Sequence, residues 1–159
     1  LNAIKMYDEA VIQYQKAIEL DTTKTDLWRE ISNVYEQKND YTKAIDAYQK
    51  YYKSLSADKQ TPDLQFQIGK LYYGKGTQSD TLTVSLDERK AALASADSVF
   101  AVITQAAPDS YLGNFWRARA NSALDPETTQ GLAKPYYEEV ATLLESKNDP
   151  HYNLSLIHI

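Results

Sequence analysis

The sequence predicts an all-α protein in which about seven helices stack side by side as a solenoid. A unit consisting of a small residue, three further residues and an aromatic residue occurs at Ala10 and Tyr14, and returns 34 residues later at Ala44 and Tyr48. The chain of 159 residues contains 13 tyrosines but only five glycines and five prolines. Helix pairs that cannot bury their apolar faces alone must stack on neighbouring pairs, so these observations predict a repeat array.

The first three helices are expected at 3–20, 25–38 and 41–54. The polar stretches 21–25 and 38–40 separate them. The second helix carries Trp28, Ile31, Ser32 and Tyr35 at relative offsets of 0, 3, 4 and 7, which is the spacing of one helix face. The first and third helices each contain the small-x3-aromatic unit, so each is expected to pack its small residue closely against a neighbour.

The fourth and fifth helices are expected at 61–74 and 87–106, with an insertion at 75–86 between them. Pro62 fits the first turn of a helix, because the missing N–H costs least there. Gly74 starts a run of glycines and short polar residues that is expected to break the fourth helix.

Two interpretations of the insertion stay open. Leu82, Val84 and Leu86 alternate with polar residues, which fits a short extended segment packed on the array. The other interpretation is a mobile surface loop, which is favoured. Ser85 or Asp87 is expected to cap the helix that follows.

The last two helices are expected at 110–123 and 129–147. Pro135 falls inside the second of these ranges, so that helix either starts near Lys134 or is kinked. The tail 149–159 matches no repeat unit. A capping strand, the start of a further element and a reading-frame artefact stay open for it, and the artefact is favoured.

These motifs resemble the tetratricopeptide repeat (TPR) family, whose 34-residue pattern is W-x2-L-G-x2-Y, then A-x3-F, then P. The matching residues are Trp28, Ile31, Ser32, Tyr35, Ala44 and Tyr48 in repeat one, Ile68, Gly69, Tyr72, Ala96, Phe100 and Pro108 in repeat two, and Trp116, Ala120, Ala133 and Tyr137 in repeat three. Segments 116–121 and 131–137 also look like bacterial TPR proteins of unassigned role. The resemblance implies a right-handed α-solenoid of helix-turn-helix repeats.

The resemblance also implies a domain organisation. The expected divisions are a solenoid over 1–148, made of a half repeat at 3–20, repeat one at 25–54, repeat two at 61–106 with its insertion at 75–86 and repeat three at 110–147, followed by the tail at 149–159. The first helix is then a second-type helix without its partner, which favours a fragment of a longer array.

Composition argues against several classes of protein. The chain has no cysteine, so disulfides and thiolate sites are excluded, and its two histidines, His151 and His158, both lie in the tail. The net charge of −5 disfavours nucleic-acid binding. No apolar run is long enough to span a membrane. We therefore expect a non-enzymatic protein without cofactor or metal, from a compartment that the sequence does not determine.

The resemblance implies that side chains one and five positions after the Trp site point into the concave groove. These are Arg29 and Asn33, Phe66 and Lys70, and Arg117 and Asn121, with Tyr73 as a further aromatic contact. Because Arg-x3-Asn supplies a forked donor and an amide on one helix face, it suits a carboxylate or a peptide backbone. The expected function is a protein-protein interaction scaffold that binds a peptide or protein segment.

Other interpretations stay open. The Arg and Asn side chains can be solvated or paired within a helix, for example Arg29 with Asp26. The chain can be a structural segment of a longer repeat protein, without a ligand of its own, or can self-associate through exposed terminal helices. The sequence also does not distinguish a scaffold from a helper subunit of an enzyme assembly. If both arginines lie in the groove, replacing Arg29 and Arg117 together by Ala should leave the fold intact.

Overall fold

The structure is a computed structural model that describes residues 2–79 and 83–146. In that part of the chain it contains seven α-helices and one short 3-10 helix. The elements are α1 (Asn2–Leu20), α2 (Leu27–Gln37), α3 (Tyr41–Ser54), the 3-10 helix Ala57–Lys59, α4 (Pro62–Thr77), α5 (Leu86–Ala106), α6 (Tyr111–Leu124) and α7 (Lys134–Ser146). The predicted tail at 149–159 lies outside the described residues.

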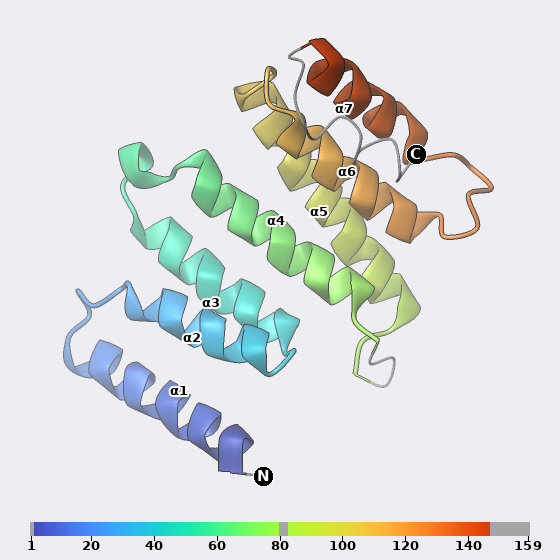
Figure 1. Cartoon of the computed structure of the whole chain (residues 1–159). Helices are drawn as coiled ribbons and strands as arrows, with labels where there is room; N and C mark the ends of the chain where they lie inside the picture. Colours follow the sequence, from blue (N-terminus) through green and yellow to red (C-terminus); the bar gives the residue numbers. More distant parts are fainter. Residues whose placement is uncertain (1, 80–82, 147–159) are drawn as a thin grey trace.

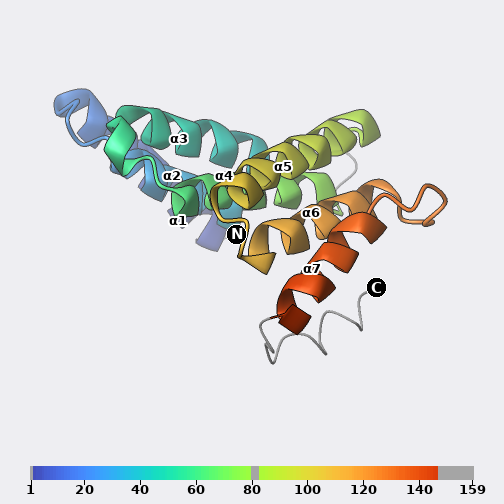
Figure 2. The ribbon, with the colours of Figure 1, turned by 90° about the horizontal axis from the view of Figure 1, so that it is seen from above.

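Each helix packs against the next one in the chain, from α1 at one end to α7 at the other (Figure 1). Seen from above, α3 and α5 lie along one side of the array, and α2, α4 and α6 lie along the other (Figure 2). The last helix departs from this arrangement, because α7 lies on the far side of α6 from α5. The predicted fold class, an all-helical array of sequentially packed helices, is confirmed.

Capping residues and a first-turn proline, all visible in the sequence, mark the starts of three helices. The Asp40 side chain accepts a hydrogen bond from the Lys43 backbone N–H and starts α3. Ser85 and Glu88 form a reciprocal capping box at the start of α5, which confirms Ser85 as the cap. Pro62 is the first residue of α4, where its missing N–H leaves no helical bond unmade.

Small residues set the close approaches between helices. The Ser32 hydroxyl donates a 2.7 Å hydrogen bond to the Ala44 carbonyl, and both residues are buried. At Gly69, an added Cβ would lie 2.7 Å from the nearest carbon of the Phe100 ring. The predicted close packing of small residues against a neighbouring helix is therefore present between α2 and α3 and between α4 and α5.

The predicted end of the fourth helix at 74 is wrong, because α4 continues to Thr77. Gly74 and Gly76 lie inside this helix and serve packing, since a Cβ on Gly74 would clash with the Tyr41 ring and one on Gly76 with Leu93. Val84 is buried, whereas Leu86 is 57% exposed at the start of α5. No strand occurs at the described residues of the insertion, and Leu82 lies outside them.

The last helix starts at Lys134, which matches one of the two expectations for Pro135. The predicted start at 129 is wrong, because the preceding loop is organised around the buried carboxylate of Asp125. This carboxylate accepts hydrogen bonds from the backbone N–H groups of Thr129, Gln130 and Gly131 at 2.8–3.0 Å. Ala133, assigned above to the small-residue position inside the helix, precedes it instead.

Candidate functional site

The first candidate pair, Arg29 and Asn33, lies on α2 and is joined by an acid between them. Arg29 Nη2 donates to Glu30 Oε1 at 3.4 Å, and Asn33 Nδ2 donates to Glu30 Oε2 at 3.3 Å. The Arg29 guanidinium also lies 5.6 Å from the centre of the Tyr51 ring. The Arg29 side chain is 48% exposed, so its ion pair contributes at most about 1 kcal/mol. This pair therefore lies at the surface.

The second candidate group belongs to an aromatic cluster between α4 and α6. We call the side chains of Phe66, Tyr73, Phe115 and Trp116 the α4–α6 cluster. Phe66 and Tyr73 meet the Trp116 ring edge-on, with centroids 5.6 Å and 5.4 Å away. Phe115 meets the same ring edge-on at 6.4 Å. All four are partly exposed, so the rings both bridge the two helices and contribute to the surface.

Lys70 lies on the same face of α4 as this cluster. It follows Phe66 by four residues and precedes Tyr73 by three, which places the three side chains in one row along the helix. Within the described residues, Lys70 makes no hydrogen bond or ion pair. Lys70 therefore lies between two aromatic residues along the helix, and no described carboxylate pairs with its charge.

Arg119 is a residue of this site that the sequence analysis missed. Its guanidinium carbon lies 4.7 Å from the centre of the Trp116 ring, 5.2 Å from that of Tyr73 and 5.9 Å from that of Phe115. The family pattern places an apolar packing residue at this position, so Arg119 was not considered as a binding residue. The signal that could have found it is a charged residue at a position where Ile31 and Ile68 stand in the other repeats.

The third candidate pair, Arg117 and Asn121, lies in the joint between α5, α6 and α7. Arg117 Nε and Nη2 donate to the two carboxylate oxygens of Asp97 at 3.0 Å and 3.4 Å, and Asn121 Nδ2 donates to Asp97 Oδ1 at 2.9 Å. Arg117 also donates to the Tyr136 hydroxyl at 3.0 Å and lies 4.3 Å from the centre of that ring. Asp97 and Tyr136, which the sequence did not single out, thus occupy the donors that were expected to face a ligand.

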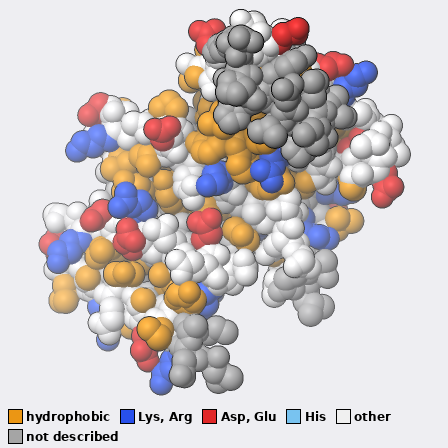
Figure 3. Space-filling model, in the orientation of Figure 1, with side chains coloured by type: hydrophobic (Ala, Val, Ile, Leu, Met, Phe, Trp, Pro, Cys, Tyr) orange, Lys and Arg blue, Asp and Glu red, His pale blue; other side chains and the backbone are white. Residues whose placement is uncertain are grey.

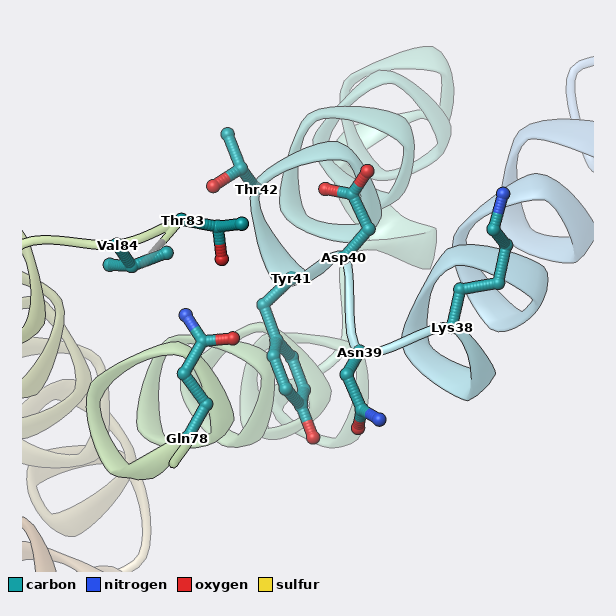
Figure 4. Close-up of a pocket in the computed structure, with 8 residues that line it drawn as sticks. All are labelled: Lys38, Asn39, Asp40, Tyr41, Thr42, Gln78, Thr83 and Val84. Atoms are coloured by element: carbon teal, nitrogen blue, oxygen red, sulfur yellow. The ribbon is translucent and has the colours of Figure 1, made fainter. Parts of the chain in front are cut away.

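A hollow of about 500 Å³ lies at the turn between α2 and α3 (Figure 4). Its lining residues are Lys38, Asn39, Asp40, Tyr41, Thr42, Gln78, Thr83 and Val84. Lys38 points away from the others and is ion-paired with Asp8, while Asp40 pairs with Lys43 at 3.0 Å. Its charged groups are thus used in one contact with α1 and in one contact within the first turn of α3.

A second hollow of about 370 Å³ lies beside the Asp125 loop. Burial alone would raise the pKa of Asp125, but hydrogen bonds from the Gln130 backbone, the Thr129 side chain and the Gly131 backbone lower it. An ionised carboxylate bound by three backbone N–H groups organises a loop, as an Asx-type turn does on a smaller scale. Asp125 therefore serves the loop that leads into α7.

Two kinds of feature are absent from the described part of the chain. Residues 2–79 and 83–146 contain no group of three His, Cys, Asp or Glu side chains that could hold a metal ion. Among these same residues, no helix has the length and apolar character needed to cross a membrane.

Comparisons with known proteins agree with the helix pairing. A family model described as "Tetratricopeptide repeat" matches residues 25–54, which include α2 and α3. A crystal structure of the C-terminal part of a TPR repeat-containing protein from Cytophaga hutchinsonii is similar with a TM-score of 0.65 and 31% sequence identity. The match covers 92% of this chain and 50% of that one, so the chain spans half the length of that structure. No curated protein matches the sequence.

Proposed function

Because the chain is a tetratricopeptide repeat protein, and such repeats generally mediate protein-protein interactions, we propose that it binds a peptide or protein segment on the face shared by α2, α4 and α6. The TPR family is typically non-enzymatic, and the proposed role is a scaffold without catalysis of its own. Figure 3 views the molecule from this side and shows hydrophobic side chains next to Lys and Arg side chains.

The observation that supports this proposal is the partial exposure of aromatic rings beside an unpaired cation on α4. Phe66 and Tyr73 offer ring surface, and Lys70 offers a charge that no described residue neutralises. Arg29 and Asn33 extend the same face on α2, where their donors share only the exposed Glu30. Extended peptides bind such surfaces through side-chain pockets and backbone hydrogen bonds.

Arg117 and Asn121 enter the proposal in a different role. Their donors are used by Asp97 and Tyr136, and the Arg117 side chain is only 21% exposed. Releasing them to a ligand would leave the Asp97 carboxylate without its partners, which is costly for a partly buried charge. We therefore assign them to the joint between α5, α6 and α7.

Site-directed photo-crosslinking tests the proposal. A benzoylphenylalanine is placed at Lys70, and the control places it at Lys90, an exposed residue of α5. The expected result is crosslinking of one partner segment at position 70 in the source cell, without capture of it at position 90. Equal capture at both positions, or none at position 70, would contradict binding on this face.

A second candidate function is that of a structural segment inside a longer repeat protein, favoured by the outer face of α1. Ala10 is only half-buried, whereas Ala44 and Ala96, at the matching positions of α3 and α5, are 0% exposed. On the same helix Met6 is 67% exposed. This face is typical of a second-type helix that packs against a further helix or a second copy of the chain.

Oligomeric state and hydrogen exchange test this second candidate. If the α1 face is normally covered, the isolated chain should self-associate with rising concentration, and the variant Met6→Lys should sediment as a monomer. The amides of α1 should also exchange faster than those of α3 in that monomer. A monomeric wild-type chain in which α1 is protected as strongly as α3 would argue against a missing neighbour.

A further inference from the structure

We propose that the α4–α6 cluster selects an acidic peptide, one in which Asp or Glu stands next to an aromatic or large aliphatic residue. This inference rests on the proposed function and names the chemistry of its partner. Two cations, Lys70 and Arg119, and four aromatic side chains carry it. None of the acidic residues described in the structure reaches either cation.

The first step is the state of the two cations. Arg29 and Arg117 each have a carboxylate within hydrogen-bond distance, whereas Arg119 contacts only the rings of Tyr73, Phe115 and Trp116. Lys70 contacts no charged or hydrogen-bonding group in the described part of the chain. In a chain of net charge −5, two unpaired cations on neighbouring helices are a local excess of positive charge.

The second step is the way in which Arg119 is held. The contact of a guanidinium with aromatic rings does not itself use up its N–H donors. In the described part of the chain these donors of Arg119 make no hydrogen bond, so they stay available for a carboxylate, which accepts two parallel hydrogen bonds from an arginine. The rings thus hold the Arg119 side chain in place and reduce the entropy that a ligand would otherwise have to remove.

The third step is the aromatic surface beside the cations. Phe66 and Tyr73 lie one helical turn to either side of Lys70, and both contact Trp116. Partly exposed rings next to a charge favour an apolar side chain that lies beside an anionic one. A single carboxylate without an apolar neighbour would use only half of this surface.

Nucleic acid is the competing anion, and the charge of the molecule argues against it. A polyanion that binds Lys70 and Arg119 would also meet the acidic side chains of a chain with 22 acidic and 17 basic residues. A short peptide with one or two carboxylates avoids that repulsion. A single-stranded oligonucleotide therefore serves as the second probe.

A random-peptide array tests the inference. The full chain is compared with Lys70→Gln, Arg119→Gln and Arg119→Lys, and with Lys90→Gln as a charge-matched control on the exposed side of α5. Peptides bound by the wild type and by Lys90→Gln should be enriched in Asp or Glu next to Phe, Tyr, Trp or Leu. Arg119→Gln should weaken the best peptide about tenfold, and Arg119→Lys less, because lysine keeps the charge but not the fork.

The outcomes separate this inference from the proposed function. Bound peptides without an acidic preference, or an acidic preference that survives in Arg119→Gln and Lys70→Gln, would overturn the inference and leave peptide binding intact. Binding of no peptide at all would contradict both. Tighter binding of a 20-nucleotide oligo-dT than of the best peptide would overturn the inference and identify nucleic acid as the partner of this surface. Thermal melts of all variants identify any loss that is due to unfolding.

Discussion

The spacing Arg-x3-Asn occurs in α2 as Arg29 and Asn33 and in α6 as Arg117 and Asn121, and the two copies lie in different surroundings. In α2 the two side chains share the exposed Glu30, one position from Arg29 on the same helix. In α6 they share Asp97, which comes from α5, and Arg117 also contacts Tyr136 on α7. Identical residues at identical spacing thus form a surface pair in one place and a joint between three helices in the other.

The difference follows from the side chains that the neighbouring helices supply. Both α1 and α3 pack on α2, but no carboxylate described on either helix reaches Arg29, whose guanidinium lies 5.6 Å from the centre of the Tyr51 ring of α3. Around α6, the neighbouring helices α5 and α7 supply Asp97 and Tyr136, which bond Arg117 (Figure 2). A polar pair on a covered face needs partners, because burial without them is costly.

The largest expected effect is a loss of stability when the packing of α4 on α5, the helix that carries Asp97, is disrupted. Gly69→Leu forces a side chain into Phe100, which lies on α5 three residues after Asp97. We expect a loss of about 3 kcal/mol or more in the free energy of unfolding, measured by urea denaturation. The control Ala94→Leu adds the same kind of bulk at an exposed position of α5 and should change stability little. Equal stability of Gly69→Leu and wild type would contradict the α4–α5 packing.

The next effect compares the two acids directly. Asp97→Ala leaves Arg117 and Asn121 without their shared acceptor and should cost about 2 kcal/mol, since the site is partly buried. Glu30→Ala removes the corresponding acid from the exposed pair and should change stability by less than about 0.5 kcal/mol. Similar losses in the two variants, measured by thermal and urea unfolding, would mean that the two pairs are equivalent after all.

A smaller effect is expected at the arginines themselves. Arg117→Ala should cost about 1.5 kcal/mol, because it removes two hydrogen bonds to Asp97 and the contact with Tyr136, while Asn121 still bonds Asp97. Arg29→Ala should be near neutral. The sequence-based expectation is that the double alanine variant leaves the fold intact because both arginines lie in the groove. A double-mutant cycle of Arg117 with Asp97 measures the coupling, and a value near zero would refute it.

The smallest effect is expected in the loop that follows α6, where Asp125 binds the backbone. The lowered pKa of Asp125 means that its contribution to stability is present above the ordinary Asp value of 3.8 and is lost as pH falls through the folded-state pKa. We expect the backbone amides of Thr129 and Gly131 to lose hydrogen-exchange protection on acidification below that value. In Asp125→Asn their protection should already be low near neutral pH and should change little with acid. Protection that is the same in both proteins would refute the role of Asp125.

Several helices could be placed from the sequence because their signals are local. Offsets of 0, 3, 4 and 7 from Trp28 identify one face of α2, and the capping residue Ser85 marks the start of α5. The errors arose where a contact with another helix outweighed the local preference of a residue. Gly76 was assigned to a helix break, but its lack of a side chain lets Leu93 approach α4, so the helix continues.

The candidate site was predicted only in part. Lys70 was identified from its place in the repeat, and its partial exposure agrees with a surface role. Arg119 was missed because the repeat pattern assigns its position to packing, and it does pack, but with its charged group over aromatic rings. A repeat pattern identifies the helix face that carries a residue, but it does not determine where the charged group of a long side chain lies.

The sequence by itself determined that the chain is helical and that its helices pair, because periodicity and side-chain size are local properties. Only the tertiary structure decided which Arg-x3-Asn pair stays on the surface. That choice depends on Asp97 and Tyr136, which lie 20 and 19 residues from Arg117 along the chain. The free energy of a charged side chain depends on all the groups that surround it, and the packing of α5 and α7 around α6 brings those groups together.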